Sequence, residues 1–139
     1  MAIGKPEDYP YVMTTFRLAE HMQAGAMTRN IPWLVEAHPE MFVEISPQLA
    51  AQIGGKNGDY VRVNTARKPE GIRVKVNITE RLLPVKVNGR DVHVVAMPWH
   101  WGFKGLSTGP SANELTIDTV DIAANIPEYK TCLCNIVKD

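Results

Sequence analysis

The sequence has no surplus of charge of either sign and no long apolar run, and both absences exclude classes of protein. Its 139 residues hold 15 Lys and Arg against 15 Asp and Glu, so the formal net charge is zero. Proteins that bind nucleic acid through its phosphates need an excess of cations, so we expect no nucleic-acid partner. No apolar run reaches the roughly 20 residues of a membrane-spanning helix, so we expect no direct membrane insertion.

Cysteine is also scarce. Cys132 and Cys134 are too few for a disulfide framework. Side chains two positions apart on a strand point to the same face, and a disulfide between them would close a strained ring, so we predict two reduced thiols. A zinc site could be assembled from these thiols with His93 and His100, but the spacing matches no familiar ligand set. We therefore expect no metal site in this chain.

Catalytic signatures are missing as well. The sequence contains no Gly-x-Gly-x-x-Gly, no Walker loop, no Gly-x-Ser-x-Gly and no His-Glu-x-x-His. We therefore predict no catalytic residue. Conspicuous polar residues remain, and for each an ordinary role competes with a functional one: Arg17 as a surface cation, His21 as a hydrogen-bonded histidine, and Trp99 and Trp101 as packing anchors.

The residues that are abundant favour strands. The sequence has 14 Val, 10 Ile and 9 Thr against 8 Leu, and β-branched residues prefer extended backbone. Ile72–Ile78 is the clearest strand, because its apolar and polar residues alternate. Further strands are predicted at Tyr11–Phe16, Met41–Ile45, Tyr60–Thr65, Val85–Val87, Val92–Met97, Leu115–Ile117 and Thr131–Val137.

One short helix has clear start and stop signals. Ser46 is suited to the N-cap, Pro47 to the first helical position, and Gly54 to a left-handed end. We expect coil over residues 31–39, with Trp33 and Leu34 as packing anchors. These short strands with one or two short helices, and no alternation of strand and helix, predict a mainly β protein built as a small closed barrel.

Six segments resemble, in the same order, one known family. They are Thr15–His21, Met27–Glu36, Glu44–Asp59, Pro98–Gly105, Ala112–Thr116 and Ile126–Lys130. Together they resemble the C-terminal molybdopterin-dinucleotide-binding domain of formate dehydrogenase alpha subunits, in the dimethyl sulfoxide reductase superfamily. The resemblance covers the chain from about Asp8 to Asp139 and implies a six-stranded double-psi β-barrel forming a single domain over residues 1–139, with residues 1–7 flexible.

The resemblance implies cofactor binding rather than turnover by this chain. The family's domain covers two molybdopterin guanine dinucleotides (the bis form) whose dithiolenes hold Mo or W. Because the ligand carries a pyrophosphate and a flat heterocycle, cations, neutral donors and aromatic rings are suitable partners. The cofactor-binding residues implied are Thr15, Arg17, Leu18, His21, His100, Trp101, Asn113, Tyr129 and Lys130.

The family's metal ligand and iron–sulfur cluster belong to other domains, so the resemblance implies as partners the rest of the alpha subunit and an electron-transfer subunit. Alternatives are a barrel subunit of a related complex, such as formylmethanofuran dehydrogenase or nitrate reductase, and a non-catalytic interaction barrel. Met1–Tyr11 lacks the plan of an export signal, so a cytoplasmic location is the default. A periplasmic location stays open if a parent subunit carries such a signal.

Overall fold

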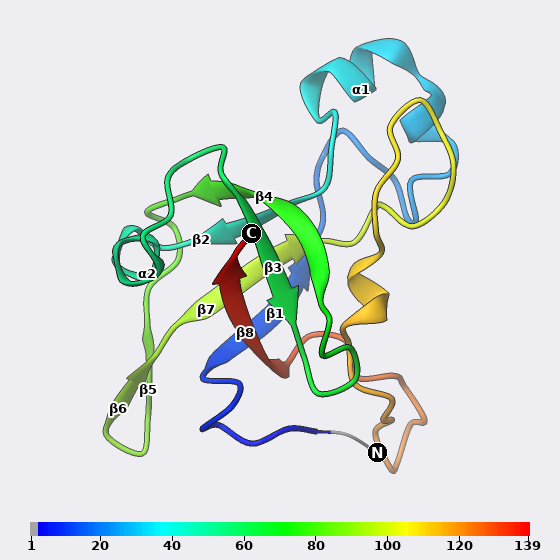
Figure 1. Cartoon of the computed structure of the whole chain (residues 1–139). Helices are drawn as coiled ribbons and strands as arrows, with labels where there is room; N and C mark the ends of the chain where they lie inside the picture. The colour runs from blue at the N-terminus through cyan, green and yellow to red at the C-terminus, as the bar shows by residue number, and fades with distance from the viewer. Residues whose placement is uncertain (1–2) are drawn as a thin grey trace.

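Six strands close into a barrel in a computed structural model that describes residues 3–139. The strands are β1 (Tyr11–Phe16), β2 (Phe42–Ile45), β3 (Tyr60–Asn64), β4 (Ile72–Ile78), β7 (Val94–Pro98) and β8 (Cys132–Lys138). Around the ring their order is β1, β7, β2, β4, β3 and β8, and β8 pairs with β1 to close it (Figure 1). This confirms the predicted barrel and is consistent with a double-psi arrangement. The expectation that residues 1–7 are flexible falls partly on residues 1–2, which lie outside the described residues.

Two of the six neighbouring pairs run parallel, which no hairpin can produce. β1 runs parallel to β7, and β2 runs parallel to β4, whereas the remaining pairs are antiparallel. Parallel neighbours need a crossover connection. The carboxyl ends of β1 and β7 therefore meet at one end of the barrel, and those of β2 and β4 meet at the other. The core inside the ring consists mainly of aliphatic side chains: Met13, Val43, Ile45, Val61, Val63, Val74, Val95, Met97 and Ile136.

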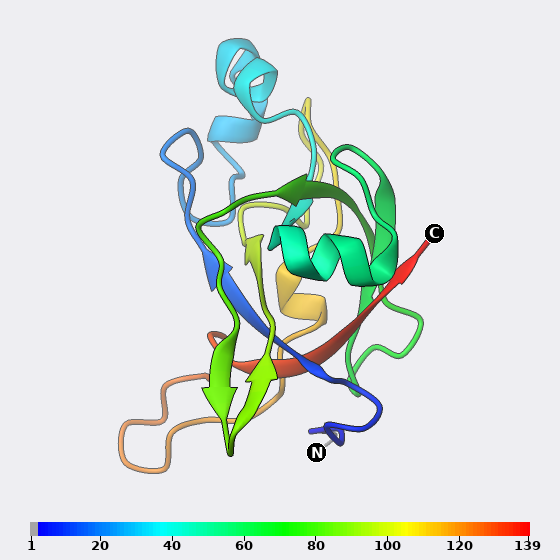
Figure 2. The same cartoon turned by 90° about the vertical axis from the view of Figure 1, so that its left-hand side faces the viewer.

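The predicted short helix is confirmed as α2 (Pro47–Ile53). The Ser46 hydroxyl accepts the Leu49 N–H at 3.1 Å, and Gly54 ends the helix in the left-handed conformation. Leu49 and Ala50 are buried, so the apolar side of α2 covers one end of the barrel core, as Figure 2 shows. β5 (Val85–Val87) and β6 (Arg90–Val92) form a hairpin that projects from the barrel with its strands largely exposed.

Three expectations are wrong. Residues 31–39 contain α1 (Pro32–Ala37) instead of coil, and Trp33 is 71% exposed instead of packed. Leu115–Ile117 is not a closing strand, because a short 3-10 helix, η2 (Ala112–Glu114), leads into it through a capping box at Ser111. β2 is buried at all four positions, so both of its faces are covered.

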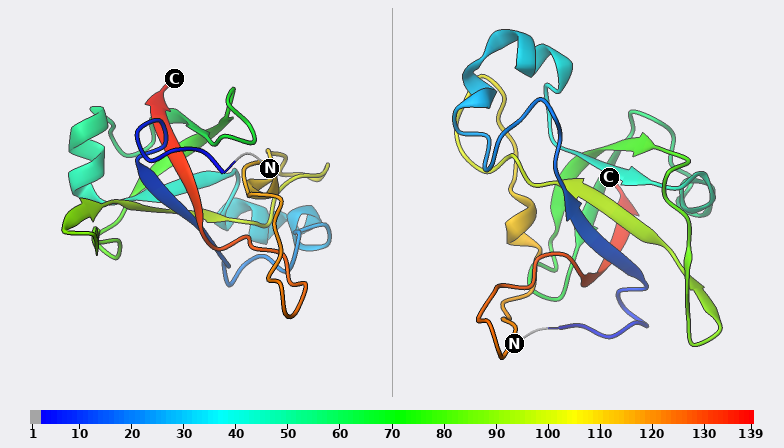
Figure 3. Two further views of the ribbon diagram at one scale, coloured as in Figure 1. Left: turned by 90° about the horizontal axis from the view of Figure 1, so that it is seen from below. Right: turned by 180° about the vertical axis from the view of Figure 1, so that it is seen from behind.

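A lobe formed by residues 17–41 and 99–111 extends beyond the barrel at the end toward which β1 and β7 point (Figures 1 and 3). It contains α1, a second 3-10 helix, η1 (Thr28–Asn30), and the loop that follows β7. Within residues 3–139 no helix is both long enough and apolar enough to cross a bilayer.

Candidate functional site

At the lobe end of the barrel Arg17 and Trp99 contact each other. In the β1–β7 register, Thr15 lies opposite Met97 and Phe16 opposite Pro98. The next residues, Arg17 and Trp99, therefore leave two parallel strands side by side. The Arg17 guanidinium carbon lies 4.8 Å from the centroid of the Trp99 ring, a cation–π geometry. Register thus places an exposed cation against an aromatic face.

Trp99 lines two hollows. The first, of about 400 Å³, lies on the lobe side and is lined by Arg17, Met22, Gln23, Ala24, Ala26, Met27 and Trp99. The second, of about 450 Å³, is lined mainly by residues from η2 onward, with Trp99 again forming part of the wall. The half-buried indole of Trp99 can stack against a flat ring of a ligand. The Arg17 guanidinium beside it can bind an anionic group of the same ligand.

Two of the predicted site residues, Asn113 and Tyr129, line the second hollow. Both are exposed, and the side-chain amide of Asn113 forms no hydrogen bond with another described residue. An amide carries both donors and an acceptor, so Asn113 can bind the edge of a heterocycle. Asp118 and Glu128 also line this hollow, so its charge is mixed.

Sequence reasoning missed Arg67 at the second hollow. Arg67 lies in the loop that connects β3 to β4. In the structure the Arg67 Nη1 donates to the Thr116 carbonyl at 2.8 Å, and its side chain lines the hollow with Trp99 and Asn113. No sequence signal marks this role, because the contact joins residues 49 positions apart.

Thr15 and Lys130 join the end of β1 to the segment before β8. The Thr15 hydroxyl donates to the Tyr129 carbonyl at 3.0 Å, and the Lys130 ammonium donates to the Thr15 carbonyl at 2.6 Å. The antiparallel pairing of Met13 with Cys132 makes both bonds possible. The structure thus uses Thr15 and the Lys130 ammonium to hold Tyr129 at the second hollow.

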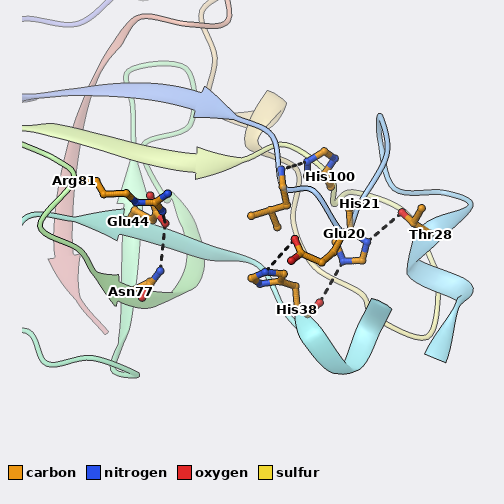
Figure 4. Close-up of polar contacts among 9 residues, drawn as sticks. Glu20, His21, Thr28, His38, Glu44, Asn77, Arg81 and His100 are labelled. Atoms are coloured by element: carbon orange, nitrogen blue, oxygen red, sulfur yellow. Dashed lines mark hydrogen bonds and ion pairs between the residues drawn. The ribbon is translucent and has the colours of Figure 1, made fainter. Parts of the chain in front are cut away.

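His100 is only 1% exposed and is bonded to Gln23, which lines the first hollow. Its Nε2 accepts the backbone N–H of Leu18 at 2.8 Å (Figure 4). Its Nδ1 donates to the Gln23 carbonyl at 2.6 Å. These partners require a neutral ring with the proton on Nδ1. Burial also lowers the pKa of His100, which favours the same form. Leu18 and His100 therefore shape the segment that leads into the hollow.

His21 and Trp101 are buried beside His100. The His21 Nε2 donates to the His38 carbonyl at 3.4 Å, and its Nδ1 lies 3.1 Å from the Thr28 hydroxyl (Figure 4). The Trp101 Nε1 donates to the Ser107 hydroxyl at 2.8 Å, and the His21 ring meets the indole edge-on. Burial lowers the pKa of His21 as well. Both side chains have partners within the lobe.

The nine predicted residues therefore cluster at one end of the barrel but divide into two sets. Arg17, Asn113 and Tyr129 line the hollows, whereas the others support the backbone around them: Thr15, Leu18, His21, His100, Trp101 and Lys130. Trp99, which the sequence favoured as a packing residue, is the wall common to both hollows. None of these placements tests contact with a ligand, which stays a prediction.

The cysteines lie apart from the hollows. Cys132 and Cys134 are both free and buried on β8. Within residues 3–139 no three His, Cys, Asp or Glu side chains gather as a metal site would require. The polar features that suit a ligand are thus the cation, the amide and the aromatic rings around Trp99.

Comparison with known proteins identifies relatives of this chain. Residues 11–133 match the model of the molydopterin dinucleotide binding domain. The chain is 43% identical over 131 residues to the formate dehydrogenase subunit alpha of Megalodesulfovibrio gigas, and 45% identical over 139 residues to the nitrate-inducible formate dehydrogenase major subunit of Escherichia coli. These matches cover 94% and 99% of the chain but only 13% of each relative, so the chain spans about an eighth of their length.

A solved structure has the same fold. Acetylene hydratase from Pelobacter acetylenicus superimposes with a TM-score of 0.69 at 16% identity, covering 96% of this chain and 19% of that one. At this identity the likeness concerns the fold alone. The family match over residues 11–133, by contrast, is specific to one kind of domain. The chain belongs to the family of molydopterin dinucleotide binding domains.

Proposed function

We propose that this chain binds a molybdopterin guanine dinucleotide at the two hollows that Trp99 lines, and that it does so as part of a formate dehydrogenase alpha subunit. The observation that carries the proposal is the Arg17 guanidinium 4.8 Å from the centroid of the Trp99 ring, beside hollows of about 400 and 450 Å³. The family match and the names of the relatives support the choice of ligand and enzyme.

The residues present fit such a ligand. Arg17 is exposed and forms no ion pair with another described residue. Its guanidinium can therefore donate two parallel hydrogen bonds to phosphate oxygens. The Trp99 ring offers a stacking face, and Asn113 and Tyr129 supply polar groups across the second hollow. Thr15, Leu18, His21, His100, Trp101 and Lys130 would act mainly by holding these groups in place.

The chemistry would take place outside this chain. When bound, the cofactor supplies a Mo or W centre that accepts the two electrons released as formate becomes carbon dioxide. Both cysteines of this chain are buried, so neither offers a ligand to that metal. We therefore propose that the chain orients the cofactor and is inactive alone, and that the metal ligand, the iron–sulfur cluster and the contact with an electron-transfer subunit belong to the remaining part of the enzyme.

Binding can be tested with GDP, which carries a pyrophosphate on a guanine nucleoside. We expect titration of the 15N-labelled chain to shift the indole N–H signal of Trp99. The signals of Trp101, whose N–H is buried against Ser107, and of Trp33, which lies on α1, are internal references. Arg17→Ala should weaken GDP binding about 10- to 100-fold, the range for losing charge-assisted hydrogen bonds.

Arg62→Ala is the matched control, because Arg62 is an exposed arginine on β3 that pairs with Asp139 at 2.8 Å. Its affinity for GDP should equal that of the unmodified chain. A Trp99 signal that does not move, or equal losses in the two variants, would overturn the binding site.

Formate oxidation needs the whole enzyme. In the Escherichia coli relative, the segment that matches this chain is replaced by residues 1–139, and pterin content, metal content and formate oxidation are measured. We expect all three to be retained, and Arg17→Ala in the chimera to lower pterin content. A folded chimera that lacks the cofactor contradicts the proposed function.

A further inference from the structure

Arg29 carries a positive charge in the interior of the lobe. It is 0% exposed, and no carboxylate of another described residue forms an ion pair with it. A guanidinium is not deprotonated in proteins, so the charge is present at every ordinary pH. A buried charge without a counter-charge destabilises a fold. The position of Arg29 therefore needs an explanation that packing alone does not give.

Hydrogen bonds fix the position of the guanidinium but do not neutralise it. Its Nη1 donates to the carbonyls of Phe103 and Ser107, the latter at 2.8 Å. Its Nε and Nη2 are buried and have no hydrogen-bond partner among the described residues. Because a carbonyl group carries no net charge, the positive charge of Arg29 stays uncompensated within residues 3–139.

The guanidinium is packed against Gly25, in the segment that lines the first hollow. A Cβ on Gly25 would lie 2.8 Å from the Arg29 Nε, and the Gly25 carbonyl accepts the Arg29 backbone N–H at 2.9 Å. Ala24 and Ala26, the two neighbours of Gly25, both line the first hollow. The buried charge is therefore in contact with the wall of this hollow.

Negative charge is scarce around the first hollow. Residues 22–35 and 97–110 contain no Asp or Glu, and their charged residues are Arg29 and Lys104. The hollow itself is lined by Arg17 and by no acidic side chain. The second hollow, by contrast, is lined by two carboxylates. The electrostatic potential of the first hollow therefore favours the anionic part of a ligand.

The three acidic residues of the lobe do not compensate the buried charge. Glu20 lies 3.4 Å from the His38 Nε2, and Glu40 accepts the Lys75 ammonium at 2.9 Å. Glu36 is exposed on α1. None of the three forms an ion pair with the guanidinium, so a counter-charge has to come from outside the described chain.

We infer that Arg29 is a second cation of the first hollow: with Arg17 it attracts the pyrophosphate of a bound dinucleotide, acting across the Gly25 backbone instead of by contact. The inference rests on the proposed function, which supplies the anion. Charges interact more strongly in the interior of a protein than in water, so a buried cation can act without touching its partner. The bound anion in turn supplies the counter-charge that the lobe lacks.

The test titrates sodium pyrophosphate into the chain and compares three variants with the unmodified protein. Arg29→Gln removes the charge, and we expect binding to weaken at least about 5-fold. Arg29→Lys keeps the charge, and we expect an affinity within about 2-fold of the unmodified chain. Arg73→Gln is the control, because Arg73 is an exposed arginine on β4 that pairs with Asp139. Its affinity should not change.

The two Arg29 variants distinguish charge from support of the loop. Both lose the paired donation to the Phe103 and Ser107 carbonyls, so a purely structural role predicts equal losses of affinity. A contribution from charge also predicts that affinity depends less steeply on salt in Arg29→Gln. Equal losses in Arg29→Lys and Arg29→Gln, or equal affinities of Arg29→Gln and Arg73→Gln, would overturn the inference.

A measurement on the unmodified chain does not depend on how the variants fold. We expect pyrophosphate to shift the 15N NMR signal of the Arg29 Nε–H, which is buried without a partner. The signal of Arg62, whose Nε donates to Asp139 at 2.8 Å, is the reference and should stay in place. An Arg29 signal that stays while the Trp99 indole signal moves would overturn the inference.

These outcomes are distinct from failure of the proposed function. If Arg17→Ala weakens GDP binding but Arg29→Gln binds pyrophosphate like the unmodified chain, the role of Arg29 alone is overturned. If pyrophosphate binding depends on Arg29 but GDP does not shift the Trp99 signal, the anion site stands and the cofactor proposal fails. No binding of pyrophosphate by the unmodified chain overturns the role of Arg29.

Discussion

His100 accepts a hydrogen bond from the backbone N–H of Leu18 at 2.8 Å, and this contact joins the loop after β7 to the first residues after β1. The opposite nitrogen of the same ring donates to the Gln23 carbonyl. The backbone around the first hollow is therefore held by a histidine that must stay neutral. Protonation of Nε2 would remove the acceptor for Leu18 and place an uncompensated charge in the lobe.

Stability should fall as the pH is lowered toward 5. Burial lowers the pKa of His100 and of His21 from the ordinary value of 6.5, so the unfolded chain binds these protons more readily than the folded chain does. The contribution is therefore fully present above about pH 6.5 and is lost as the pH falls through the lower folded values. The carboxyl pKa values of Glu40 and Glu114 are lowered from 4.5, so their titration lies below this range.

Thermal unfolding at about pH 7.5, 6 and 5 checks this expectation, with NMR titration of the histidine ring signals. His100→Gln and His21→Gln should each reduce the dependence of the thermal midpoint on pH. A thermal midpoint that is constant over this range contradicts it.

Two glycines offer a matched test of packing in the lobe. Gly54 and Gly25 both have positive φ, at 64° and 77°. A Cβ on Gly54 meets nothing within 4 Å, whereas one on Gly25 would overlap the His100 carbonyl and lie 2.8 Å from the Arg29 Nε. We expect Gly54→Ala to cost about 1–2 kcal/mol from backbone strain alone. Gly25→Ala should cost about 3 kcal/mol or more, because overpacking is added.

Urea unfolding of the two glycine variants measures the difference. Equal losses of stability would show that the backbone of the lobe can move to accommodate the added methyl group. Gly25 would then not be packed tightly against His100.

The two thiols should be unreactive in the folded chain. Burial raises the pKa of Cys132 to about 11 and that of Cys134 well above its ordinary value. Because the thiolate is the reactive form, we expect a disulfide reagent at about pH 8 to modify the native chain at least ~100-fold more slowly than a free cysteine. Both thiols should react at once in denaturant. Rapid modification of the native chain would mean that β8 opens readily.

Lys130 distinguishes a supporting role from a contact with phosphate. Its ammonium donates to the Thr15 carbonyl at 2.6 Å, which helps to hold Tyr129 at the second hollow. We expect Lys130→Met to lower stability by about 1 kcal/mol, the usual value of one hydrogen bond, and to weaken GDP binding less than Arg17→Ala does. An equal loss of affinity in the two variants would instead support the cofactor contact that the resemblance implies for Lys130.

Elements with local signals were predictable from the sequence. Ile72–Ile78 alternates because one of its faces lies against the core, and Ser46, Pro47 and Gly54 mark the ends of α2 through interactions within the helix itself. The family resemblance singled out nine residues that the fold brings to one end of the barrel, although their contact with a ligand stays a prediction. It also correctly predicted a closed barrel, which the strands alone only suggested.

Other features depended on contacts between distant parts of the chain. Leu115–Ile117 has the composition of a strand, but the Ser111 capping box turns the chain into η2 before it. Trp33 has the composition of a core residue, yet α1 leaves it exposed on the lobe. Neither result follows from local preference, because burial depends on which surfaces the fold brings together.

By itself the sequence determined the strand-rich composition, the capped helix α2, the absence of excess charge and the family. The tertiary structure alone decided that Arg17 and Trp99 meet, since they are adjacent only because β1 and β7 run parallel in register. It also decided that His21, His100 and Trp101 are buried supports whereas Arg67 lines a hollow. The physical reason is that a side chain's partners are set by strand pairing across the barrel, which local sequence does not encode.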